Sequence, residues 1–183
     1  MTRMATLWIA LLAAAPAGGR EVSGVEVPGS YAVGGESLEL NGAGLRKKFI
    51  FKVYVGALYL KERSSDAASI LAADAPWAVR MTFLRDVTRS QLMGAFREGF
   101  ENNSKEGLEG LLMQLAGVEG SLGDVKSGEV LVVAYQPGEG STIGVEGQKA
   151  VTVPGKEFSD ALLRNWLGLR PADDGLKRAM LGG

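Results

Sequence analysis

The stretch from Phe49 to Leu60 reads FIFKVYVGALYL. It is rich in β-branched and aromatic side chains, and it is apolar at odd and even positions alike, with Lys52 as its only charge. A strand that is apolar on both sides is usually covered on both faces. This stretch therefore predicts the central strand of a sheet that is packed on both sides.

Hydrophobic periodicity and turn residues predict the elements around this strand. Strands are expected near 22–27, 37–46, 77–84, 129–135, 141–145 and 149–153, with Asn41-Gly42 as a turn or bulge in the second of these. Helices are expected near 65–73, 88–102, 105–115, 156–167 and 171–181. Ser64 or Ser65 should cap the first helix, and Thr88 with Gln91 forms the capping-box pattern of the second. This order of elements predicts an α+β domain with a mostly antiparallel sheet.

Length and composition limit the chemistry. The chain has 183 residues, the usual size of one domain, of which 46% are hydrophobic and 22% charged. Lysine plus arginine number 20 and aspartate plus glutamate 21, so no net basic charge is present to bind nucleic acid. The sequence holds no histidine and no cysteine, which excludes His-based triads, cysteine nucleophiles, disulfides and the usual zinc sites. No metal or other cofactor is expected.

The first 17 residues, MTRMATLWIALLAAAPA, have the pattern of a secretory signal. One arginine precedes a short apolar stretch, and Ala15-Pro16-Ala17 supplies the small residues of a cleavage site. We therefore expect a signal peptide over 1–17, a single domain over 18–183, and a periplasmic or secreted protein. No later stretch approaches the ~20 apolar residues of a membrane span, so none is expected after cleavage.

Several polar residues fall where the periodicity points inward. Arg46 precedes the most apolar strand, Lys52 and Tyr54 share one face of it, and Asn103 and Asn165 lie on apolar faces of helices. Any one of them alone is more often a solvated arginine, a packed tyrosine or a capping asparagine. Together they describe an apolar cavity with a few convergent polar groups, in which an arginine fork suits a carboxylate.

Three segments resemble the chalcone isomerase family: LNGAGLRKKFIFKVYVGALYL at 40–60, AFREGFENNS at 95–104 and FSDALLRNWLGLRP at 158–171. The resemblance covers roughly 22–181. It implies an open-faced β-sandwich, in which helices cover a large antiparallel sheet and a ligand cleft lies between them. The family includes isomerases that close a chalcone to a flavanone, and non-catalytic members such as fatty-acid-binding proteins.

The resemblance also assigns site positions. Arg46 matches the family arginine, Tyr54 falls where the isomerases have a threonine, and Asn165 falls at a late-helix threonine or serine. The isomerase tyrosine and asparagine, seven residues apart, fall at Phe96 and Asn103, so that one hydroxyl is missing. Losing a donor to a developing oxyanion can cost ~10²–10³ in rate.

The resemblance thus favours a binding protein for a fatty acid or another small apolar acid. Its ligand-binding residues would be Arg46, Tyr54, Phe96, Phe100, Asn103 and Asn165. The alternative is an intramolecular lyase of the chalcone isomerase type that uses Arg46, Tyr54, Asn103 and Asn165. A third possibility is a structural or interaction module that keeps only the fold.

Overall fold

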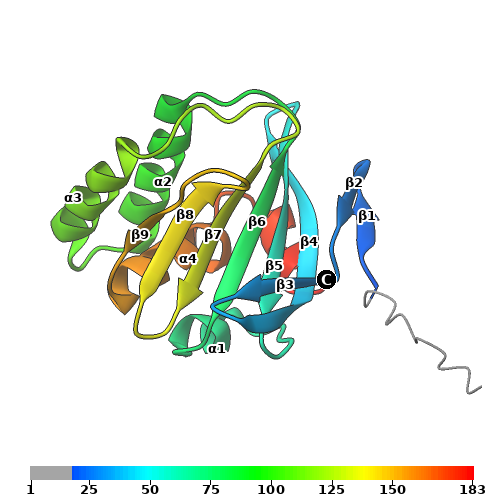
Figure 1. Ribbon diagram of the computed structural model, residues 1–183, viewed down its shortest axis with the longest axis horizontal. Coiled ribbons are helices and arrows are strands. Elements are labelled where there is room, and N and C mark those ends of the chain that lie inside the picture. Colours follow the sequence, from blue (N-terminus) through cyan, green and yellow to red (C-terminus); the bar gives the residue numbers. More distant parts are fainter. Residues whose placement is uncertain (1–17) are drawn as a thin grey trace, which may run out of the picture.

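The computed structural model describes residues 18–183, so the segment expected to be a signal peptide lies outside the described residues. The strands are β1 (Arg20–Val22), β2 (Val25–Val27), β3 (Ser30–Val33), β4 (Glu36–Lys48), β5 (Phe51–Leu60), β6 (Trp77–Phe83), β7 (Val130–Gln136), β8 (Gly140–Val145) and β9 (Val151–Val153). The helices are α1 (Ala67–Ala72), α2 (Arg89–Asn103), α3 (Leu108–Glu119), α4 (Lys156–Leu167) and α5 (Asp174–Met180) (Figure 1).

Seven strands form one antiparallel sheet in the order β3-β4-β5-β6-β7-β8-β9, and β1 pairs with β2 in a separate hairpin. The predicted α+β class with a large antiparallel sheet is confirmed. The most apolar strand, β5, is an interior strand, but β6 holds the middle position. β5 also begins at Phe51 rather than Phe49, because Phe49 and Ile50 form the turn from β4.

Both faces of β5 are covered, as its sequence predicts. Tyr54 and Leu58 belong to the core shared with the helices, whereas Val55 and Tyr59 belong to a second core on the opposite face. Helices α2 and α4 pack on each other on the first side, and β3 crosses over the second side (Figure 1). The alternation of β5 side chains thus places Tyr54 toward the helices.

The helix starts follow local capping chemistry. The capping box of α2 is present: the Thr88 hydroxyl accepts from the Gln91 N–H, and the Gln91 side chain accepts from the Thr88 N–H. The expected serine cap of α1 is wrong, since the Asp66 carboxylate accepts from the Ala68 N–H at 2.9 Å and caps the helix instead. Helix α3 begins at Leu108, later than expected, because Gly107 is left-handed at a φ of 66°.

The expected break at Asn41-Gly42 is a change of register in the pairing of β4 with β5. The Asn41 side chain donates to the Met180 carbonyl at 2.7 Å and so holds α5 against β4. Gly42 faces the Ala179 carbonyl at a distance that leaves no room for a Cβ. The glycines of this strand therefore allow α5 to pack close to the sheet.

Within residues 18–183, no helix has both the length and the apolar character needed to cross a bilayer.

Candidate functional site

A cavity of about 220 Å³ opens beside β4, β5 and β6 and is closed by α2 and α4. Its apolar walls are formed by Phe49, Phe51, Val53, Met81, Phe83, Val87, Leu92, Ala95, Phe96, Trp166 and Ala172. The polar residues that line it are Arg46, Lys48, Tyr54, Arg85, Asp86, Gln91 and Asn165. Ligand cavities have this composition, an apolar surface with a few placed polar groups.

Tyr54 presents a hydroxyl that is held in one orientation. The indole Nε1 of Trp166 donates to its oxygen at 2.9 Å, and both side chains are buried. Burial raises the pKa of Tyr54, so the hydroxyl keeps its proton at neutral pH. Because its oxygen already accepts from Trp166, the Tyr54 proton is free for donation toward a ligand.

Arg46 stands opposite Tyr54 in the β4–β5 register, with its guanidinium carbon 5.5 Å from the centre of the tyrosine ring. Its Nε is buried and has no hydrogen-bond partner. In the described part of the chain, no carboxylate lies within ion-pair distance of Arg46. A guanidinium in this state has unused capacity for an anion.

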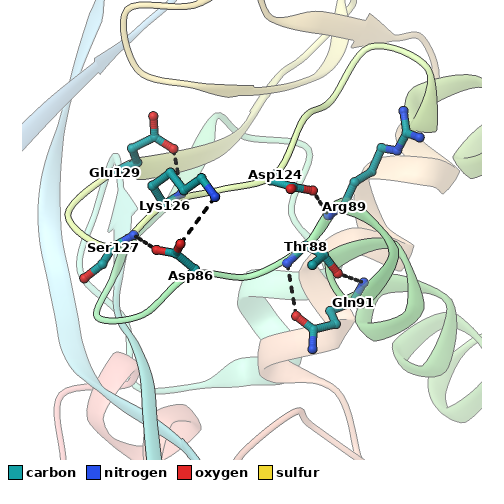
Figure 2. A network of polar contacts seen from close by, with 8 residues as sticks. All are labelled: Asp86, Thr88, Arg89, Gln91, Asp124, Lys126, Ser127 and Glu129. Carbon is teal, nitrogen blue, oxygen red and sulfur yellow. Dashed lines mark hydrogen bonds and ion pairs between the residues drawn. The ribbon is translucent and has the colours of Figure 1, made fainter.

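Two carboxylates near the cavity are engaged elsewhere. Asp86 accepts from the Ser127 N–H at 2.9 Å and from the Lys126 ammonium at 3.3 Å (Figure 2). The bond from the Ser127 N–H, followed by that from Lys126, lowers the pKa of Asp86. Asp173 accepts from the N–H groups of Lys47 and Leu176 and caps α5. Neither carboxylate forms an ion pair with Arg46.

The rim that carries Asp86 is fixed to the loop before β7. In addition to the bonds of Asp86, the Arg89 N–H donates to Asp124 at 2.9 Å (Figure 2). Val87 also pairs with Val125. The cavity therefore has a defined wall, and Arg46, Lys48 and Arg85 outnumber Asp86 among its charged residues. Its electrostatic character favours an anionic ligand.

Asn165 is buried at the same cavity, and neither its amide nitrogen nor its amide oxygen has a hydrogen-bond partner. Buried polar atoms are normally satisfied. An orphaned amide that lines a cavity can therefore donate to, and accept from, a molecule bound there.

The structure brings together four of the six expected ligand-binding residues, Arg46, Tyr54, Phe96 and Asn165. Phe100 and Asn103 do not line this cavity. Phe100 is fully buried and packs edge-on against Phe158, with ring centres 5.7 Å apart. The Asn103 amide donates to the carbonyls of Gly99 and Arg170 and accepts from the Arg170 N–H. Both residues hold α2 to α4 and to the loop after it.

Sequence reasoning missed other lining residues, of which Trp166 is the most informative. It follows Asn165 directly, and its ring also meets the Phe96 ring edge-on with centres 6.3 Å apart. A buried tryptophan usually finds a hydrogen-bond partner for its N–H. From this rule, the sequence could have indicated that Trp166 lies beside a polar group. Lys48 and Phe83 are the last residues of β4 and β6, and Arg85 lies in the bend after β6; only the assembled sheet brings these positions together.

No group of three or more acidic, histidine or cysteine side chains that could hold a metal ion occurs among residues 18–183.

The comparisons with known proteins agree with this architecture. The fold is similar to the crystal structure of the fatty-acid binding protein AtFAP1 from Arabidopsis thaliana, with a TM-score of 0.68 and 15% sequence identity. The alignment covers 87% of this chain and 92% of that one. No curated protein matches the sequence. The family described as chalcone isomerase-like matches residues 19–182, and the chain therefore belongs to that family.

Proposed function

We propose that this protein binds a fatty acid or another small apolar carboxylic acid in the cavity, without catalysis. The observation that carries the proposal is the unpaired Arg46 guanidinium beside the Tyr54 hydroxyl, at a cavity with apolar walls. AtFAP1, which has a similar fold, is described as a fatty-acid binding protein, and this supports the proposal.

The ligand carboxylate would accept charge-assisted hydrogen bonds from Arg46 and a hydrogen bond from the Tyr54 hydroxyl. An arginine fork can donate two parallel bonds to one carboxylate, which fixes orientation as well as charge. The Asn165 amide would complete the polar end, and the alkyl chain would lie against rings such as Phe96. Binding would thereby satisfy Arg46 and Asn165, two side chains with buried atoms that lack partners in the protein.

The size of the cavity limits how much of an alkyl chain it can enclose. Its volume of about 220 Å³ corresponds to roughly seven groups the size of a water molecule at ~30 Å³ each. We propose that the carboxylate and the first carbons of the alkyl chain lie in the cavity, and that the rest of the tail leaves past Phe49 and Phe51 at the β4–β5 turn. We further propose that the protein acts after export, as its N-terminal sequence suggests.

The test is mass spectrometry of small molecules released by denaturing the purified protein. Wild type should release a fatty acid or a similar apolar acid, and Arg46→Ala should release much less. Arg97→Ala is the matched control, because Arg97 is exposed on α2 and outside the cavity. Protein that purifies empty and shows no calorimetric binding of any fatty acid would contradict the proposal.

A chalcone absorbance-decay assay separates binding from the intramolecular lyase alternative. Phe96 contributes a ring and no hydroxyl to the cavity, so we expect decay no faster than in buffer. A rate above buffer that falls in Arg46→Ala would establish the lyase instead.

A further inference from the structure

The turn between β4 and β5 exposes consecutive large apolar side chains. Phe49 is 89% exposed, Ile50 87% and Phe51 52%. A single exposed apolar residue is ordinary on a protein surface, but a contiguous apolar group at the tip of a hairpin commonly marks a contact surface. The turn lies at the top of the sheet in Figure 1, at the end of two long strands.

The backbone at this tip is also unfavourable for the residue it carries. Phe49 has a φ of 55°, and it is the first residue of the two-residue turn between Lys48 and Phe51. Hairpin turns place glycine at such a position, because a bulky side chain is strained there. Phe49 therefore adds neither core burial nor backbone stability, and its presence calls for another reason.

Basic residues surround the apolar tip. Lys47 and Lys48 precede it, Lys52 follows it, and all three are exposed. Within the described chain none of them forms an ion pair. The Arg85 guanidinium lies 4.9 Å from the centre of the Phe51 ring. The acidic groups on packed neighbours, Asp86 and Asp173, are engaged by the bonds described above.

We propose that this tip docks on the surface of an anionic lipid bilayer. Phe49 and Ile50 would enter the boundary between headgroups and acyl chains, and the lysines would contact the lipid phosphates. Apolar insertion combined with a basic patch gives reversible attachment without a membrane span. A second copy of this chain is a poorer occupant, because two such tips would bring like-charged lysines together.

The position of the tip gives the docking a consequence. Lys48, Phe49 and Phe51 also line the cavity, so its opening would face the bilayer. An apolar acid could then pass between membrane and cavity with little exposure to water; this consequence, unlike the docking itself, rests on the proposed function.

Flotation with lipid vesicles tests the docking. One set of vesicles contains roughly three parts phosphatidylcholine to one part phosphatidylglycerol, and the other contains phosphatidylcholine alone. Residues 18–183 should float with the anionic vesicles, and high salt should release them. Vesicle binding that is absent, or equally strong for both compositions, overturns the proposal.

The variants use residues of the tip that do not line the cavity. Ile50→Ser should weaken vesicle binding about tenfold or more, since it removes the inserted side chain. Lys47→Gln with Lys52→Gln should weaken it about twenty-five-fold, at about fivefold for each lysine near an anionic surface.

The matched controls lie on other surfaces and should leave vesicle binding unchanged. Met113→Ser removes an exposed apolar side chain of α3, and Lys105→Gln with Lys149→Gln removes two exposed lysines that do not line the cavity. Vesicle binding that falls equally in controls and tip variants overturns the proposal. A dimer in sedimentation that dissociates in Ile50→Ser also overturns the proposal, because the tip would then bind a second copy.

Calorimetry with octanoate on the same variants separates this proposal from the proposed function. Tip variants that bind octanoate as wild type does, yet fail to float, support the docking. If wild type binds octanoate and does not float, the docking fails and the proposed function stands. If wild type floats and binds no fatty acid, the proposed function fails and the docking stands.

Discussion

Trp166 donates a hydrogen bond from its indole Nε1 to the hydroxyl of Tyr54 at 2.9 Å. The bond joins α4 to β5 at the cavity. The hydroxyl proton of Tyr54 stays free to donate a second hydrogen bond. It orients the hydroxyl beside Arg46, whose guanidinium carbon lies 5.5 Å from the same ring. One hydrogen bond within the protein thus prepares Tyr54 for a second one to a ligand.

Tyr54→Phe should lower both stability and ligand affinity. The change leaves the buried Trp166 N–H without an acceptor, which costs about 1–3 kcal/mol in denaturant unfolding. It also removes the donor to the carboxylate, so the affinity for octanoate should fall at least several-fold.

Tyr59→Phe is the matched control, because the Tyr59 hydroxyl donates to the Pro28 carbonyl and belongs to the opposite core. It should cost about 0.5–1.5 kcal/mol of stability and leave the affinity unchanged. Equal losses of affinity in the two variants would show that Tyr54 acts only through folding.

Arg46→Leu should abolish binding of the acid and change the stability of the empty protein by no more than about 1 kcal/mol. The loss of the contact with the Tyr54 ring is offset by the removal of an unpaired, half-buried charge. Denaturant midpoints of delipidated wild type and variant provide the measurement. A loss of about 3–5 kcal/mol would mean that Arg46 belongs to a structural ion pair.

Asn165→Leu should keep or raise the stability of the empty protein. The side chains are similar in size, and the change removes two buried polar atoms that have no partner. Affinity for octanoate should fall, since the amide would no longer meet the carboxylate. Thermal unfolding without ligand and calorimetry with octanoate check the two parts. A clear destabilisation combined with unchanged affinity would assign Asn165 a structural role.

Asn103→Ala should lower the stability of the protein and leave its affinity for octanoate unchanged. The Asn103 amide makes bonds of 3.0 Å to the Gly99 carbonyl, 2.8 Å to the Arg170 carbonyl and 2.9 Å from the Arg170 N–H. Their loss should cost about 1–3 kcal/mol of stability. Octanoate affinity should not change, because Asn103 lies outside the cavity. A selective loss of affinity would place Asn103 in the binding site after all.

The sequence predicts much of the fold because its signals are local. The continuous apolar pattern of β5 and the Thr88–Gln91 capping box depend on neighbouring residues only, and both features are present. The prediction is wrong at Phe49 and Ile50, where apolar side chains form an exposed turn instead of the start of a strand. Hydrophobic pattern alone cannot separate a buried strand end from an apolar tip kept for contact with something else.

The site is predictable where one element presents its residues to the cavity, and less so where several elements meet. Arg46 lies opposite Tyr54 because of the pairing register of β4 with β5, which contains two shifts. The spacing of residues in the sequence does not predict such shifts. Helical spacing places Phe96, Phe100 and Asn103 on one face of α2, but that face passes from the cavity to α4 along its length. A periodicity gives the direction of a side chain and not what lies opposite it.

The central claim is that the cavity recognises a carboxylate through Arg46, and calorimetry with a matched pair of ligands tests it most directly. Delipidated wild type is titrated with octanoate and with methyl octanoate, which share the alkyl chain and differ in charge. The account predicts measurable binding of the acid by wild type, binding of the ester at least about tenfold weaker, and, in Arg46→Leu, binding of the acid no stronger than that of the ester. Equal binding of acid and ester by wild type, or an unchanged preference in Arg46→Leu, would contradict it.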